Sequence, residues 1–387
     1  MNLDKVFCAE LAALEQTSLR RTLRAADELG LLNFAGNDYL GLSQHPTLIE
    51  TARQATAQRG TGTGASRLVT GTDSAVLALE EQLAAWKEKE AALIFSSGYA
   101  AALGTIPALV GKGDIIVLDK LTHASLIDAA RLSGATVRVF PHNDLGKLEA
   151  LLQKISRTHT NDKSRVLVIT ESIFSMDGDA ASLREIVELK DRFGAWLLVD
   201  EAHATGLYGK TGAGLLSEMG LSSRVEIVMG TLSKALGSVG GYIAGSRVLI
   251  DWLVNRARSF IYSTALPPGV IAASHAAVEL ARGPEGAALR TQLRENIVHF
   301  HAGLVSSWKN NPLSSSAIQP LICGEASVAL HLAATLREKG FLIPAIRYPT
   351  VARNAARLRV TLSAVHARKD IDALNHALLV NAATAIQ

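Results

Sequence analysis

From about residue 91 the chain alternates short apolar runs with longer amphipathic stretches. Continuous apolar runs are typical of strands buried on both faces of a sheet, and helical stretches between them are typical of crossover connections. The predicted strands are Ala91–Phe95, Ile115–Leu118, Val137–Phe140, Val166–Thr170, Trp196–Val199 and Val225–Met229. The predicted helices between them include Tyr99–Val110, Ala124–Leu132 and Ser182–Phe193. The pattern therefore predicts an α/β fold with a mostly parallel sheet.

Four further elements are predicted before this alternation. Residues 4–29 contain neither proline nor glycine, so we expect a helix that ends at Gly30. A short strand is expected over Leu31–Ala35, followed by a helix from about Pro46 to Gln58 with Pro46 in its first turn. The last is a helix over Asp73–Lys89, with Asp73 as its N-cap.

Length and pattern together predict two domains. Residues 46–284 hold the alternating pattern and are expected to form the large domain. Residues 285–387 are expected to form a smaller α/β domain, and the N-terminal segment, residues 1–45, is expected to pack with it. The expected strands of the small domain are Leu321–Cys323, Phe341–Ile346 and Leu358–Leu362.

Composition narrows the classes of function. The net charge is only +3 over 387 residues, which gives no reason to expect nucleic acid or a membrane as a partner. The two cysteines, Cys8 and Cys323, have no metal-type spacing, so we expect no disulfide, no metal site and a reducing, cytoplasmic location. Acidic Asp4 and Glu10 and the lack of a long apolar core argue against a signal peptide.

Polar residues gather at the carboxyl ends of the predicted strands, which is where parallel sheets bind ligands. They are Ser97, Gly98, Tyr99, His123, Ser175, Asp200, His203 and the stretch Thr231–Lys234. In that stretch Thr231, Ser233 and Lys234 follow a strand and are flanked by glycines. Hydroxyls and backbone freed by glycine suit a phosphate, and a partly desolvated lysine can bind an aldehyde covalently. Asp200, at the end of an earlier strand, can keep a pyridinium nitrogen protonated, so the set indicates a site for pyridoxal 5′-phosphate (PLP).

Taken singly, each of these residues has a plainer interpretation. His123 could cap a helix or pack in the core instead of stacking on a flat cofactor. Ser97–Tyr99 could be an ordinary capped helix start. Arg357 and Arg359 share one face of a predicted strand, where one guanidinium could bind a carboxylate, or both could be surface charges. The coincidence of many polar groups at strand ends favours the functional interpretation.

Eight motifs, spread over nearly the whole chain, also carry a family resemblance. They are Asn37–Leu42, Gly64–Val69, His123–Ser125, Phe174–Asp179, Asp200–His203, Gly230–Gly237, Ser263–Pro268 and Ile346–Ser363. In these motifs the chain resembles the α-oxoamine synthases, which are PLP-dependent transferases of fold type I. The resemblance implies a large domain with a mostly parallel sheet and a smaller C-terminal α/β domain.

The resemblance also implies roles around the cofactor. Lys234 is implied to carry the aldehyde, Asp200 to pair with the pyridinium nitrogen and His123 to stack on the ring. The implied cofactor contacts are Gly98, Tyr99, His123, Asp200, Thr231 and Lys234, with Ser175 and His203 at the phenolic oxygen. Thr264 is implied to reach the phosphate from the other subunit, which implies a homodimer with shared sites.

Substrate contacts follow from the same resemblance. They are implied to be Arg21, Asn37, His123, Arg347, Thr350 and Arg359, with Arg359 holding the amino-acid carboxylate. The stretch Arg347–Val351 followed by Arg357–Arg359 favours the branch that condenses L-alanine with pimeloyl-CoA or pimeloyl-[acyl-carrier protein] in biotin biosynthesis. Two alternatives stay open: an enzyme using glycine and another acyl-CoA, such as a 2-amino-3-oxobutyrate CoA ligase, and a PLP-binding protein without catalysis. Tyr348 stands where many relatives carry proline, and Asn354 where glycine is common, which bears on the acyl chain length.

Overall fold

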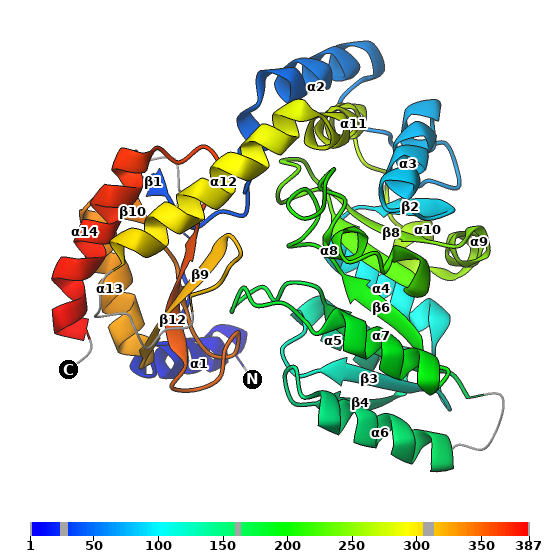
Figure 1. The fold of residues 1–387 in the computed structure, drawn as a ribbon, viewed down its shortest axis with the longest axis horizontal. Helices are drawn as coiled ribbons and strands as arrows, with labels where there is room; N and C mark the ends of the chain where they lie inside the picture. The colour runs from blue at the N-terminus through cyan, green and yellow to red at the C-terminus, as the bar shows by residue number, and fades with distance from the viewer. Residues whose placement is uncertain (1, 24–29, 159–163, 305–312, 386–387) are drawn as a thin grey trace. The chain divides into compact units, whose positions relative to one another are not determined.

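The computed structural model describes residues 2–23, 30–158, 164–304 and 313–385. Its chain divides into two compact units (Figure 1). The larger unit comprises Asp38–Ser175 and Asp179–Thr291, and the smaller unit comprises Met1–Asn37, Met176–Gly178 and Gln292–Gln387. The predicted domain boundaries at residues 46 and 285 stay a prediction, because compactness alone is no test of independent folding.

A seven-stranded sheet with the order β2-β8-β7-β6-β5-β3-β4 forms the centre of the larger unit. Its strands are β2 (Ala91–Phe95), β3 (Ile115–Asp119), β4 (Thr136–Phe140), β5 (Val166–Glu171), β6 (Trp196–Asp200), β7 (Ile227–Thr231) and β8 (Gly241–Gly245). The pairs from β4 to β7 are parallel, whereas β8 lies antiparallel between β7 and β2. The mostly parallel sheet is therefore confirmed, with β8 as a strand that the pattern did not predict. Its short apolar segment, Tyr242–Ala244, lies between glycines, which weaken the strand signal.

Helices cover both faces of this sheet (Figure 1). The helices of the larger unit are α2 (Pro46–Arg59), α3 (Ser74–Trp86), α4 (Gly98–Leu109), α5 (Ala124–Ser133), α6 (Leu145–Thr158), α7 (Leu183–Arg192), α8 (Leu215–Glu218), α9 (Arg247–Arg256), α10 (Arg258–Ile261) and α11 (Pro268–Arg282), with the 3-10 turns η2 (Leu42–Gln44) and η3 (Ser222–Arg224). On one face, Ile116 and Leu198 of the sheet belong to one apolar cluster with Ile106 of α4 and Leu126 of α5. Residues whose side chains point to the other face of the sheet, such as Val117, are buried as well. Burial on both faces explains why inner strands such as β3 and β5 are mostly apolar, whereas the edge strand β4 is largely exposed and includes Arg138.

In the smaller unit, two small sheets and helices pack together. β9 (Ile318–Gly324), β11 (Ala345–Ile346) and β12 (Ala356–Thr361) form an antiparallel sheet in the order β11-β12-β9. β1 (Leu32–Asn33) pairs in parallel with β10 (Phe341–Leu342). The helices are α1 (Leu3–Gln16), α13 (Ala326–Glu338) and α14 (Arg368–Ala385), and α12 (Pro284–Gly303) contains the unit boundary.

The predicted helix over residues 4–29 is wrong in its length, since α1 ends at Gln16. Its end is a Schellman motif: the Leu19 N–H donates to the Leu14 carbonyl, and Ser18 has a left-handed φ of 57°. The Thr17 hydroxyl also donates back to the Ala13 carbonyl. Serine can enter the left-handed region without the usual glycine, so the stop has no strong sequence signal. The last part of the prediction, residues 24–29, lies outside the described residues.

The single strand predicted over Phe341–Ile346 is two strands, β10 and β11. Pro344 lies between them, and it has no N–H to donate to a ladder. Its carbonyl instead accepts from the Arg359 N–H of β12. Proline therefore divides the apolar run between two different sheets.

Candidate active site

A cavity of about 240 Å³ opens at the carboxyl ends of the strands in the larger unit. It is lined by Ser97, Gly98, Tyr99, His123, Ser125, Glu171, Asp200, Ala202, His203, Met229, Thr231, Ser233 and Lys234. Seven of the predicted cofactor residues are among them: Gly98, Tyr99, His123, Asp200, His203, Thr231 and Lys234. The parallel sheet brings together side chains that lie far apart in sequence.

Lys234 follows β7 and is held within a hydrogen-bonded chain of side chains. Its Nζ lies 2.7 Å from Nε2 of His203, and Nδ1 of His203 lies 2.6 Å from the Tyr39 hydroxyl. The glycines around Lys234 have packing roles of their own. A Cβ on Gly230 would meet the Tyr242 hydroxyl at 2.3 Å, and Gly237 has a φ of +62° and lies against the Ser43 backbone. The structure thus explains these two glycines by close packing, whereas the sequence analysis related them to a phosphate.

Asp200 is the last residue of β6 and is buried, with 5% of its surface exposed. Its Oδ1 accepts from the Ala202 N–H at 2.8 Å. Burial raises the pKa of the Asp200 carboxyl, while nearby Lys234 acts to lower it. A buried carboxylate facing a cavity is stabilised by a cationic ligand, and a pyridinium nitrogen is such a ligand.

His123 caps the N-terminus of α5, where its Nδ1 accepts from the Ser125 N–H. Burial lowers the pKa of its imidazole, although Asp200 acts to raise it, so the ring is neutral near pH 7. The capping interpretation of His123 is therefore correct, and the ring also lines the cavity. Stacking of the ring on a flat cofactor stays a prediction.

The start of α4 presents backbone N–H groups at the same cavity. Ser97 is its N-cap, with its Oγ accepting from the Ala100 N–H at 3.0 Å. Thr231 Oγ1 lies 2.7 Å from Ser233 Oγ and donates to the Gly240 carbonyl. A helix N-terminus beside two hydroxyls is a suitable site for a phosphate.

A buried ion pair supports the turn after Asp200. The next residue, Glu201, binds Nζ of Lys87 through Oε2 at 2.9 Å, and Lys87 also donates to the Thr205 hydroxyl at 2.9 Å. Burial opposes the charged form of Lys87, but Glu201 and Tyr242 outweigh it and raise its pKa. Removal of one partner would leave a buried charge unpaired. The pair therefore holds the segment that carries Asp200 and His203.

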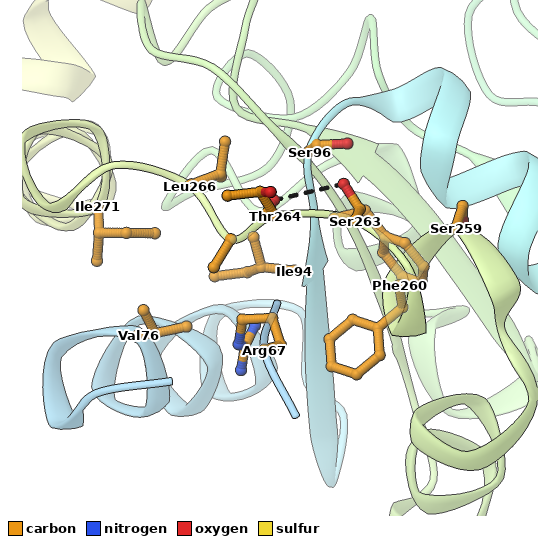
Figure 2. Close-up of a pocket in the computed structure, with 12 residues that line it drawn as sticks. Arg67, Val76, Ile94, Ser96, Ser259, Phe260, Ser263, Thr264, Leu266 and Ile271 are labelled. Atoms are coloured by element: carbon orange, nitrogen blue, oxygen red, sulfur yellow. Dashed lines mark hydrogen bonds between the residues drawn. The ribbon is translucent and has the colours of Figure 1, made fainter. Parts of the chain in front are cut away.

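Two predicted cofactor residues do not line this cavity. Ser175 is buried and is not among the lining residues. Thr264 is exposed and forms a β-bridge with Ser66. Figure 2 shows Thr264 beside Ser263, whose hydroxyl donates to the Thr264 carbonyl at 3.3 Å, at a separate hollow of about 20 Å³.

The predicted substrate residues other than His123 lie in the smaller unit. Arg359 is buried and donates to Asn37 Oδ1 and to Thr361 Oγ1, each at 3.0 Å. Arg21 lies 3.5 Å from the Thr350 hydroxyl. Arg347 donates to the Ser18 carbonyl, and burial together with nearby Arg21 lowers its pKa. These residues thus form two clusters. Arg359 and Asn37 make up one, and Arg21, Arg347 and Thr350 make up the other.

Sequence reasoning missed three residues of the site. Glu171 lines the cavity at the end of β5, Ser125 hydrogen-bonds the His123 ring at 2.8 Å, and Tyr39 contacts His203. The rule of polar residues at strand ends also applies to Glu171, and it could have found this residue. Tyr39 gave no such signal, because it comes from a distant segment ahead of η2.

The residues of the cavity fit PLP. They supply a lysine for the aldehyde, a buried carboxylate for the ring nitrogen, a neutral imidazole for the ring face and a helix N-terminus for the phosphate. Among the side chains that the structure describes, no group of three or more His, Cys, Asp or Glu could hold a metal ion. The chemistry of the donor set is thus that of an organic phosphate with an aldehyde.

Fold and site together define a PLP-dependent enzyme of fold type I, and comparisons with known proteins specify the family. The sequence pattern of the aminotransferase class I and II family matches residues 30–378. The 8-amino-7-oxononanoate synthase of Geobacter metallireducens is 45% identical, with 95% of this chain and 96% of the relative covered. The enzyme of that name from Herminiimonas arsenicoxydans is also 45% identical, with 95% and 97% covered. The chain belongs to the aminotransferase class I and II family and, within it, to the 8-amino-7-oxononanoate synthases.

Solved structures agree with this placement. A serine palmitoyltransferase of S. paucimobilis with bound PLP and myriocin superposes with a TM-score of 0.91 at 26% identity, covering 100% of this chain and 99% of that one. An 8-amino-7-oxononanoate synthase of Francisella tularensis gives 0.74 at 27% identity, covering 92% and 97%. The protein is thus a PLP-dependent acyltransferase. No helix within the described ranges has the length and apolar character of a membrane span.

Proposed function

We propose that this enzyme condenses L-alanine with a pimeloyl thioester, carried on coenzyme A or on acyl carrier protein. The products are 8-amino-7-oxononanoate, CO2 and the free thiol carrier, as a step of biotin biosynthesis. The name shared by relatives that are 43–46% identical supports this substrate pair. The observation that carries the chemistry is the meeting of Lys234, Asp200 and His123 in one cavity.

When bound, PLP supplies an aldehyde for amino groups and a protonated ring that withdraws electrons. Lys234 would hold the aldehyde until the amino acid replaces it, and its free Nζ would then take the Cα proton. His203 Nε2, 2.7 Å from that Nζ, would orient the amine, and Tyr39 would hold the imidazole in turn. Asp200 would keep a proton on the ring nitrogen through its carboxylate.

Other residues would bind and orient. The neutral ring of His123 would stack on the cofactor, and the N-terminus of α4 with Gly98, Tyr99 and Thr231 would bind the phosphate end. Ser175 is proposed at the phenolic oxygen with His203. We further propose a homodimer in which the partner subunit's Thr264 reaches the phosphate.

In the smaller unit, we propose that Arg359 binds the carboxylate of L-alanine, with Asn37 orienting the guanidinium at 3.0 Å. Arg21, Arg347 and Thr350 are proposed to bind the acyl donor. Arg21 and Arg347 have no carboxylate within ion-pair distance among the described residues, so both can bind a negatively charged or ester-ended chain. A cytoplasmic location is proposed from the two free cysteines, Cys8 and Cys323.

The test is a matrix of amino acids against thioesters. Alanine, glycine and serine are each assayed with acetyl, succinyl, pimeloyl and palmitoyl thioesters, and kcat/KM is measured for every pair. We expect the highest value for alanine with pimeloyl. A maximum for glycine with acetyl would instead assign a 2-amino-3-oxobutyrate CoA ligase, and no turnover with any pair would favour a PLP-binding protein without catalysis.

A further inference from the structure

Glu171 is a second buried carboxyl group in the cavity, and the mechanism above does not use it. It is the last residue of β5, next to β6, and its register partner there is Asp200. Both residues line the cavity, and their exposed fractions are 2% for Glu171 and 5% for Asp200. The parallel sheet therefore places two carboxyl groups side by side, away from water.

Within the described part of the chain, the carboxyl group of Glu171 has one defined hydrogen bond. Its Oε1 accepts from the backbone N–H of His123 at 2.5 Å. That N–H belongs to the residue that caps α5 and whose ring lines the cavity. The contact fixes the backbone from which the His123 ring extends, and a buried N–H without an acceptor would be costly.

The charges in the cavity do not favour two carboxylates. Of the residues that line it, Lys234 is the one with an ammonium group, and the ring of His123 is neutral near pH 7. The carboxylate of Asp119 also acts electrostatically on Glu171, but it is paired with His142, whose Nδ1 lies 3.0 Å from Asp119 Oδ1. Two adjacent buried carboxyl groups opposite one ammonium cannot both ionise without a large penalty. Burial, with Asp200 adding to it, raises the pKa of Glu171 well above its ordinary value.

We propose that Glu171 is a positioning residue that acts in its protonated form: it holds the His123 backbone through Oε1 and leaves Asp200 as the anionic carboxylate of the cavity. This inference rests on the proposed use of Asp200 and His123 around PLP. It assigns the two carboxyl groups different tasks. Asp200 provides a negative charge for the ring nitrogen, and Glu171 provides an uncharged acceptor that adds no second negative charge.

Two substitutions separate charge from hydrogen bonding. Glu171→Gln keeps the oxygen acceptor and is always neutral, so PLP affinity is expected within about threefold of the wild-type value. Glu171→Ala removes the acceptor from a buried N–H, so PLP binding is expected to weaken roughly ten- to hundredfold. PLP affinity is measured by equilibrium dialysis, and the matched control is Glu188→Gln on the exposed side of α7.

The protonation state has its own readout. The infrared spectrum of the wild-type holoenzyme at pH 7 is expected to show the carbonyl stretch of a protonated carboxyl group, and the spectrum of Glu171→Gln is expected to lack it. Glu188→Gln should retain the band. Absence of the band in the wild type, or weak PLP binding by Glu171→Gln equal to that of Glu171→Ala, would overturn the neutral role. Wild-type affinity in Glu171→Ala would overturn the positioning role. Neither readout depends on which acyl donor is used, so a different outcome of the substrate matrix would leave both intact.

Discussion

At the scale of single residues, Lys234 and Asp200 meet because of their places on neighbouring strands. Asp200 ends β6, Lys234 follows the end of β7, and these two strands pair in parallel. Their carboxyl ends thus lie at the same edge of the sheet. The Lys234 side chain is half-buried, so its truncation removes an amine from the cavity with little loss of apolar packing.

Substitution of this lysine is the first test of the covalent site. The purified protein is expected to be yellow, and borohydride should fix PLP to Lys234. In Lys234→Ala the label is expected to disappear, and kcat should fall by about 10²–10⁴-fold because the base for the Cα proton is lost. Peptide mapping locates the label. Substitution of the exposed Lys210 by alanine is the control, and this variant should keep both the label and the activity. A label on another lysine of the wild type would refute Lys234 as the residue that binds PLP.

The two departures from the family pattern have local explanations. Asn354 has a φ of 59°, in the left-handed region that glycine adopts readily and that asparagine tolerates better than most residues. Asparagine can therefore replace glycine there with the backbone preserved. Tyr348 is 43% exposed, and the guanidinium of Arg353 lies 4.5 Å from its ring centroid. Its contact is thus a cation–π pair on the surface of the smaller unit.

At the scale of elements, one histidine links two loops of the larger unit. His142, just after β4, lies 3.0 Å from Asp119 at the end of β3 and 2.8 Å from Asp179. Asp119 precedes the turn to His123, and Asp179 follows the loop of Ser175. Burial opposes the charged form of His142, but the hydrogen bonds to both aspartates raise its pKa from 6.5 to about 10.

This pKa predicts a pH dependence of stability. Because the folded pKa lies above the unfolded value, the stabilisation is complete below about pH 6.5 and is lost as pH rises through about 10. His142→Gln is therefore expected to unfold more readily than the wild type at pH 6 to 8, with a difference that shrinks toward pH 10. Urea unfolding across this range measures it. The control, His299→Gln, removes a more exposed pair with Asp372 and should change stability little. If the stability difference between His142→Gln and the wild type were constant with pH, charged His142 would not be the source of the stabilisation.

The sequence predicted features that depend on residue patterns and missed features that depend on backbone geometry. Apolar runs predicted six strands of the large sheet, and the rule that ligands bind at strand ends then brought Asp200, His123 and Lys234 together without any structure. Features decided by backbone geometry were not visible. Ser18 ends α1 through a left-handed φ, and Pro344 divides one apolar run between two sheets. Glu171 stands at the end of β5 as Asp200 stands at the end of β6, so the strand-end rule covered it, and its omission was not forced by the sequence.

At the scale of the whole molecule, the proposed homodimer depends on the segment that carries Thr264. Its segment is held to another part of the larger unit: the Ala265 N–H donates to the Ala65 carbonyl at 2.9 Å, and the Thr63 hydroxyl donates to the Ala265 carbonyl at 3.0 Å. Thr264 is nevertheless exposed and does not line the cavity of its own chain. A fixed, exposed hydroxyl is well placed to complete a site on another copy, in line with the homodimer proposed above.

The last prediction tests this sharing. Thr264→Ala is expected to bind PLP about ten- to hundredfold more weakly, since a hydrogen bond to a charged phosphate is lost. It should melt like the wild type, and the neighbouring Ser263→Ala serves as the control.

Mixed dimers of Thr264→Ala and Lys234→Ala distinguish whether Thr264 acts across the interface or within its own chain. If Thr264 acts across the interface, each mixed dimer has one site with both residues intact, so half of the sites should regain wild-type PLP affinity and activity. If it acts within its own chain, every site has lost one of the two residues and no affinity returns. Sedimentation showing an active monomer at the assay concentration would also contradict the shared site.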